Sequence, residues 1–154
     1  CRQDAGAPTL RLVELQTQSH AVAPGKRCIA YFTMFARRKR IWLRNINPAD
    51  LYLSVVTIGE IERGIIRQCR INPQFAEDLQ RWLDTVLLRH QQRILPLSIN
   101  IARCWGRLSG ELGNNNTDLM IAVTALEHNL TVATRNIRHF EPTQVRLIDP
   151  YLAL

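Results

Sequence analysis

The sequence predicts an α/β domain with a mainly parallel central sheet, and two observations lead to this prediction. Short apolar runs rich in β-branched residues alternate with longer segments in which apolar residues recur every three or four positions. Capping and turn residues separate the two kinds of segment, as is typical of a parallel sheet covered by helices. The 154 residues, 46% of them apolar, are sufficient for one domain with a buried core.

The first predicted strand covers residues 51–56, a run rich in β-branched and aromatic residues. The next four residues, from Thr57 to Glu60, have the form of a capping box and are expected to begin a helix. A second helix is expected to begin at Asn72-Pro73, where an N-cap precedes proline. Its apolar side consists of Phe75, Leu79, Trp82, Leu83, Val86 and Leu87.

Three more strands and two more helices follow in alternation. Residues 93–96 are predicted to form a short strand, and Ser98 is expected to cap the helix after it. A helix is expected over residues 117–128, and strands over 130–133 and 145–148.

The composition excludes several other classes of protein. Charged residues make up 21% of the chain, which is close to the globular norm and argues against disorder. No apolar run approaches the roughly 18–20 residues of a membrane helix, and no signal-peptide pattern is found. The cysteines lie too far apart for a metal-binding pair or a disulfide scaffold. We therefore expect a soluble cytoplasmic protein that does not bind membranes.

The net charge of +7 comes entirely from the first third of the chain. Residues 1–47 hold nine basic and two acidic residues, whereas residues 48–154 hold eleven of each. Neither strand nor helix periodicity persists in residues 1–47. The basic run Arg37–Arg40 is more often a solvated surface than a phosphate site. We therefore expect a basic, atypical and poorly packed segment at 1–47 and a folded domain at 48–154.

Three polar groups are expected at one edge of the sheet, where ligands collect in parallel α/β domains. Glu60 begins the helix after the first strand, Asp118 begins a later helix, and Thr134 to Asn136 directly follow a strand. Converging carboxylates at such an edge are suited to Mg²⁺ or Mn²⁺.

Each group also has a purely structural interpretation. Glu60 is explained equally by the capping box with Thr57, Asp118 by the positive end of its helix dipole, and residues 134–136 by turn formation. No shared metal-ligand spacing links the four histidines, which are expected on the surface or in the core (His20, His90, His128 and His139). These patterns alone leave the function open.

Four stretches of the sequence match the pattern of a known protein family, both in their order and in the distances between them. They are Leu51–Gly64, Thr117–Ala125, Leu130–Phe140 and Arg146–Tyr151. Through them residues 50–154 resemble the PIN-domain ribonuclease toxins of the VapC family, in its FitB-like branch. The resemblance implies a PIN-like three-layer sandwich. It also implies a toxin of a type II toxin–antitoxin pair: a metal-dependent enzyme that hydrolyses RNA, is inhibited by a cognate antitoxin protein and commonly forms a homodimer.

The resemblance also implies roles for individual residues. PIN enzymes cluster three or four acidic residues around Mg²⁺ or Mn²⁺, and Glu60 and Asp118 match two of these metal-binding acids. Thr134 and Asn136 match a polar turn and are expected to orient water or the scissile phosphate. Many relatives have a further acid at the place of Asn136 or of His139, and neither position is acidic here.

The start of the chain departs from the family pattern. The family begins with an apolar strand that ends in Asp-Thr-Asn, and nothing in residues 1–47 matches it. We therefore expect the usual first strand to be missing and residues 1–47 to be foreign to the domain, as a displaced reading frame would produce. A site with at most two carboxylates is expected to be impaired.

Three functions from different classes follow. The first is an active or impaired metal-dependent ribonuclease toxin. The second is a catalytically inactive PIN-like protein that only binds an antitoxin, because two carboxylates are few for an ion with near-octahedral coordination. The third is a basic nucleic-acid-binding module formed by residues 26–44, which is disfavoured because this charge lies outside the predicted fold.

Overall fold

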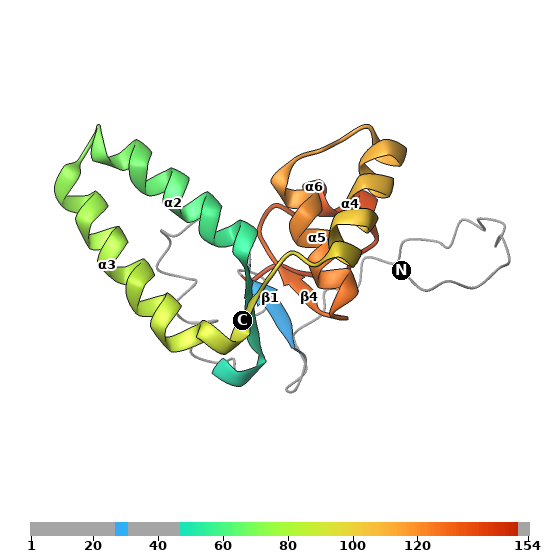
Figure 1. Ribbon diagram of the computed structural model, residues 1–154, viewed down its shortest axis with the longest axis horizontal. Coiled ribbons are helices and arrows are strands. Elements are labelled where there is room, and N and C mark those ends of the chain that lie inside the picture. The colour runs from blue at the N-terminus through green and yellow to red at the C-terminus, as the bar shows by residue number, and fades with distance from the viewer. Residues whose placement is uncertain (1–26, 31–46, 151–154) are drawn as a thin grey trace, which may run out of the picture.

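The structure is a computed structural model that describes residues 27–30 and 47–150, and its centre is a five-stranded sheet (Figure 1). The strand order is β3-β2-β1-β4-β5, and every pair of neighbouring strands is parallel. This arrangement confirms the predicted α/β class. The strands are β1 (Cys28–Ala30), β2 (Leu51–Ser54), β3 (Ile94–Leu95), β4 (Thr131–Ala133) and β5 (Leu147–Ile148).

The expectation that the first strand is missing is wrong, because β1 is the middle strand of the sheet. Cys28 is in register with Leu51 of β2 on one side and with Thr131 of β4 on the other. Cys28 and Ile29 are both buried. A run of only three residues is too short to show strand periodicity, and the basic pair Lys26-Arg27 precedes it.

The position of β1 also changes the predicted domain boundary. A segment foreign to the domain would not supply its central strand, so this hypothesis is wrong for residues 28–30. The packing predicted for the rest of residues 1–47, including the basic run Arg37–Arg40, lies outside the described residues.

Two groups of helices flank the central sheet (Figure 1). Figure 1 shows α2 and α3 as an antiparallel pair at one end of the molecule and α4, α5 and α6 gathered at the other. The α-helices are α2 (Val55–Cys69), α3 (Pro73–His90), α4 (Ile99–Leu112), α5 (Thr117–Glu127) and α6 (Ile137–Phe140). Short 3₁₀ helices are η1 (Pro48–Asp50), η2 (Gln91–Arg93) and η3 (Glu141–Thr143). None of the helices in the described ranges is long and apolar enough to cross a membrane.

The helix starts follow local capping, and two of the three predicted caps are confirmed. The side chain of Asn72 accepts a hydrogen bond from the Phe75 amide at 3.1 Å, and that of Ser98 accepts one from the Ile101 amide at 3.2 Å. Each cap satisfies an amide of the first turn that has no partner within the helix.

The predicted capping box at Thr57 and Glu60 is wrong, because α2 begins two residues earlier. Ser54 is the N-cap, and its Oγ accepts a hydrogen bond from the Val56 amide at 3.2 Å. The strand predicted over 51–56 therefore ends at Ser54. Thr57 lies inside the first turn, where its buried Oγ1 has no hydrogen-bond partner among the described residues.

The central helix of the core is α5, which packs against both the sheet and α4. Its residues Ile121, Ala122 and Ala125 are buried in one cluster with Ile29 of β1 and Val132 of β4. On another side of the helix, Leu119 and Val123 are buried with α4 residues Ile101 and Cys104. A helix buried on several sides holds its N-terminus in a fixed position relative to the sheet.

Candidate functional site

The carboxyl ends of parallel strands lie at one edge of a sheet. The chain order places three elements of the predicted site at this edge. Helix α2 begins directly after β2, and the turn at residues 134–136 begins directly after β4. Helix α5 precedes β4, so its C-terminus leads to the opposite edge and its N-terminus lies at the carboxyl edge. This is the edge at which open α/β sheets bind ligands.

Asp118 is the best-defined residue of the predicted site. It lies in the first turn of α5, and its side chain is only 8% exposed. The helix is capped by Asn116, whose Oδ1 accepts a hydrogen bond from the Leu119 amide at 2.9 Å. Because Asn116 performs the capping, the Asp118 carboxylate is available for another partner.

That partner is His139 of α6. Its Nδ1 lies 2.7 Å from Oδ2 of Asp118, and an ionised carboxylate only accepts, so the ring donates from Nδ1. The His139 side chain is 55% exposed although Asp118 is buried. Sequence reasoning missed this residue as a member of the site, because histidine spacing carries no sign of a contact across 21 residues. The available signal was its position in the final turn, where many relatives have an acid.

Glu60 lies on α2 with its side chain 22% exposed, and its Oε2 is 2.8 Å from Nη2 of Arg63. Since Ser54 caps the helix, no capping role remains for Glu60. Helices α2 and α5 contact each other. That Glu60 and Asp118 share one cleft stays a prediction.

The two predicted site residues in the turn after β4 differ in burial and in their hydrogen bonds. Thr134 is buried, and its Oγ1 accepts a hydrogen bond from the Asn136 amide at 3.0 Å. Its own amide donates to the Ile148 carbonyl at 2.9 Å. The Thr134 hydroxyl therefore forms the turn itself. Asn136 is exposed just before α6, and its side chain makes no capping hydrogen bond.

The donor atoms at this edge suit a hard divalent cation, although they are few. Asp118 and Glu60 offer carboxylate oxygens, and one turn before Glu60 the buried hydroxyl of Thr57 has no hydrogen-bond partner within the described ranges. Such oxygen donors are the ones that Mg²⁺ and Mn²⁺ accept. Within residues 27–30 and 47–150, no group of three His, Cys, Asp or Glu side chains is placed to hold a metal ion.

A parallel sheet in the order β3-β2-β1-β4-β5, with an acidic residue at the start of α5, defines a PIN-domain protein. The PIN-domain family model matches residues 28–143, and the chain belongs to this family. The match begins at Cys28, the first residue of β1, and so extends well before residue 50, where the sequence resemblance was expected to begin.

Known relatives agree with this assignment. The chain is 28% identical over 116 residues to toxin FitB of Neisseria gonorrhoeae, an alignment that covers 71% of this chain and 82% of FitB. Over 48 residues it is 38% identical to ribonuclease VapC14 of Mycobacterium tuberculosis, covering 31% of this chain and 47% of VapC14. The crystal structure of FitAcB from Neisseria gonorrhoeae superposes with a TM-score of 0.69 at 25% identity, covering 80% of this chain and 98% of that one.

Proposed function

We propose that this protein is the toxin of a type II toxin–antitoxin pair and that it hydrolyses RNA phosphodiester bonds with the help of Mg²⁺ or Mn²⁺. The observation that carries the proposal is the buried Asp118 carboxylate at the carboxyl edge of a PIN-domain sheet, held by His139 at 2.7 Å. Homology to a toxin and to a ribonuclease supports the assignment of the reaction.

Asp118 and Glu60 would hold the metal ion, and the Thr57 hydroxyl, one turn before Glu60 on α2, would be a further oxygen donor. The chemistry that a bound divalent cation supplies is a water of lowered pKa and a neutralising charge beside the phosphate. His139 fixes the orientation of the Asp118 carboxylate through Oδ2, which leaves Oδ1 for the ion. The exposed Asn136 amide would bind water or a phosphate oxygen, while Thr134 maintains the turn that presents it.

The level of activity is expected to be low. In the family the first strand ends in Asp, whereas β1 is followed here by Tyr31. The resemblance implies that many relatives have a further acid at the place of Asn136 or at that of His139, and neither residue is acidic here. Fewer carboxylates attract the cation less strongly and orient the attacking water less well. We expect RNA cleavage to be about 10²-fold or more slower than in a relative that has all of its metal-binding acids. This estimate assumes that losing a metal ligand reduces activity at least as much as losing a residue that hydrogen-bonds to such a ligand.

A second candidate function is that of a catalytically inactive protein that only binds the antitoxin. The absence of a three-residue metal cluster from the described part of the chain favours it. Solved structures of similar fold are toxin–antitoxin complexes, which supports an antitoxin partner for either function. We further propose a homodimer in the cytoplasm, as the family resemblance implies.

The test is an RNase assay of the purified chain with Mg²⁺ and with Mn²⁺, using Glu60→Gln and Asp118→Asn as controls. Weak metal-dependent cleavage that both substitutions abolish is the expected result. Cleavage that persists in both variants, or no cleavage by the unaltered chain at high Mn²⁺, would refute the enzymatic proposal and leave the binding function.

A further inference from the structure

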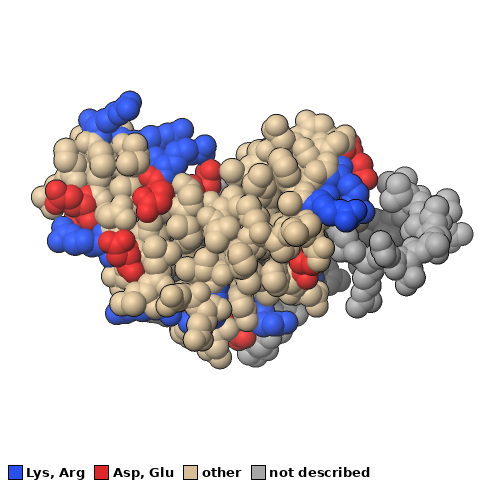
Figure 2. Space-filling model, in the orientation of Figure 1, with Lys and Arg blue, Asp and Glu red and all other residues tan. Residues whose placement is uncertain are grey.

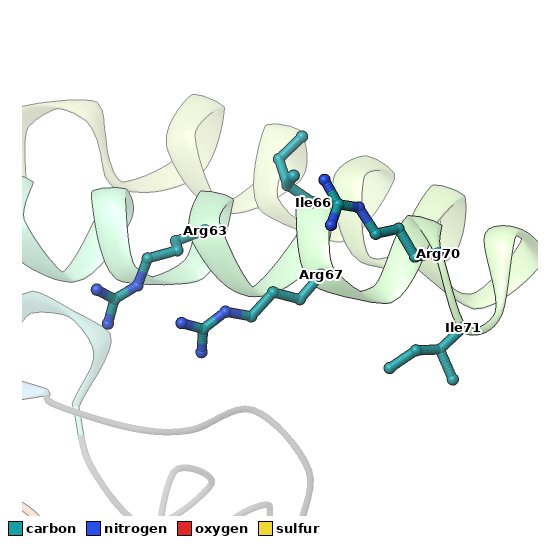
Figure 3. A pocket seen from close by; sticks show the side chains of 5 residues that line it. All are labelled: Arg63, Ile66, Arg67, Arg70 and Ile71. Atoms are coloured by element: carbon teal, nitrogen blue, oxygen red, sulfur yellow. The ribbon is translucent and has the colours of Figure 1, made fainter.

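One face of α2 carries a row of arginines that the proposed site does not use. Arg63, Arg67 and Arg70 recur every three or four residues, which brings them to one face of the helix. Together with Ile66 and Ile71 they line a cavity of about 600 Å³. Figure 3 shows the Arg63 and Arg67 side chains extending in the same direction from successive turns, whereas the Arg70 side chain, at the C-cap of α2, extends back towards Ile66. These five residues are called the α2 arginine face below.

The α2 arginine face is both charged and apolar. Figure 2 shows arginine side chains gathered over the α2 end of the molecule. Arg63 pairs with Glu60, whereas Arg67 and Arg70 have no ion-pair partner within the described ranges. Ile66 is 61% exposed and Ile71 is 75% exposed. Exposed guanidinium groups beside exposed aliphatic side chains suit a ligand that alternates anionic and apolar groups.

We propose that the α2 arginine face binds the sugar–phosphate backbone of single-stranded RNA next to the cleavage site. The inference rests on the proposed ribonuclease function and extends it to the path of the substrate. With a helical rise of about 1.5 Å per residue, the row from Arg63 to Arg70 covers about 10 Å. This length allows contacts with two successive phosphates. Guanidinium groups bind phosphate oxygens in pairs, and the isoleucines offer contact to ribose and base faces.

Continuity with the proposed site favours RNA over an acidic protein segment. Arg63 is joined to Glu60 by an ion pair of 2.8 Å, so the row begins at a proposed metal ligand. It then runs along α2 towards the α2–α3 turn, away from the sheet (Figure 1). A strand whose scissile phosphate lies at the sheet edge is thereby led onto the α2 arginine face. An acidic peptide has charge complementarity with the arginines but no reason to begin at Glu60.

The experiment measures binding of a fluorescent twelve-nucleotide single-stranded RNA of mixed sequence to the full chain carrying Asp118→Asn, over a range of salt concentrations. Arg67→Ala with Arg70→Ala is the test variant. Loss of two phosphate contacts is expected to reduce the slope of log K against log salt by about 1.4 and the affinity at 0.1 M salt by about 25-fold. Arg67→Lys with Arg70→Lys keeps the charge and is expected to retain most of the slope.

The matched control is Arg103→Ala with Arg107→Ala, which removes two exposed arginines from α4 and changes the net charge equally. This control is expected to leave the slope unchanged. An equal effect of both alanine variants would overturn the proposal, because it would show a dependence on net charge alone. Binding of a glutamate-rich peptide that needs Arg67 and Arg70, with RNA binding unaffected, would also overturn it and assign the face to a protein partner.

The outcomes separate this inference from the proposed function. RNA binding that depends on Arg67 and Arg70 in a chain without metal-dependent cleavage would keep the binding face and reject the enzyme. Cleavage that is abolished by Asp118→Asn, with RNA binding indifferent to Arg67 and Arg70, would keep the enzyme and reject the binding face.

Discussion

His139 Nδ1 donates a hydrogen bond of 2.7 Å to Oδ2 of Asp118, joining α6 to the first turn of α5. The family resemblance implies a further acid at the place of Asn136 or of His139, and in this chain the His139 imidazole instead orients the Asp118 carboxylate. Outer hydrogen bonds of this kind hold metal-binding side chains in place. The contact therefore gives His139 a positioning role even though its residue type departs from the family pattern.

The first prediction tests this positioning role. His139→Ala should weaken Mn²⁺ binding about 10- to 100-fold, because the Asp118 carboxylate loses its partner. In His139→Asn the side-chain amide takes the place of Nδ1–H, and binding should be largely retained. Calorimetric titration with Mn²⁺ measures both affinities directly. Equal loss in the two variants would contradict the role of the Nδ1 hydrogen bond.

The second prediction restores an acid next to β1. The family resemblance implies an Asp at the end of the first strand, and Tyr31 is the residue that follows Ala30 of β1 in the sequence. Tyr31→Asp should strengthen Mn²⁺ binding and raise RNA cleavage by about tenfold or more, because a further fixed carboxylate attracts the cation. The same change in the Asp118→Asn background should have no effect on cleavage. If Tyr31→Asp leaves the affinity for Mn²⁺ unchanged, the low carboxylate number is not what limits the site.

A third prediction concerns the buried Thr57 hydroxyl, which has no hydrogen-bond partner in the part of the chain that the structure describes. Burial of an unsatisfied polar group costs about 1–3 kcal/mol. Thr57→Val has a similar shape and should raise the free energy of unfolding by about 1 kcal/mol in the absence of metal. The same variant should bind Mn²⁺ less tightly if the hydroxyl is a metal ligand. Denaturant unfolding and Mn²⁺ titration measure the two effects, and a destabilised variant would show that Thr57 has a partner in solution.

The fourth prediction tests the position of β1 through its cysteine. Burial, together with the charge of Asp50, raises the pKa of the Cys28 thiol to about 11. At pH 8 such a thiol is only about 0.1% thiolate, the form that reacts with disulfide reagents. In a Cys1→Ser background, the exposed Cys69 should react with such a reagent rapidly, and the buried Cys28 and Cys104 slowly. A fast Cys28 in the Cys69→Ser, Cys1→Ser chain, with Cys104 of α4 still slow, would place β1 outside the sheet.

The long periodic elements could be predicted from the sequence, and the short ones could not. The caps at Asn72 and Ser98 and the apolar helix at residues 117–127 have local signals that the structure confirms. Strand β1 has three residues, which is below the length at which alternation can be recognised. Its identity as a strand depends on Leu51 and Thr131, its partners far along the chain.

The candidate site shows the same division between local and distant information. Glu60 and Asp118 could be proposed because each lies near a predicted helix start. The choice between Ser54 and Thr57 as the cap could not be made, because both residues are good N-caps and the end of the strand decides between them. The contact between His139 and Asp118 joins two elements through tertiary packing, for which spacing along the chain has no signature.

The register of β1 has a consequence for how the protein folds. Because Cys28 pairs with Thr131, the middle of the sheet closes a loop of about a hundred residues, and sheets with such distant pairings fold slowly. During synthesis β1 leaves the ribosome long before β4, so the edge that holds Asp118 and His139 can assemble only after α5, β4 and α6 have all been made. Chains that stop before residue 139 therefore lack the contact between His139 and Asp118 altogether.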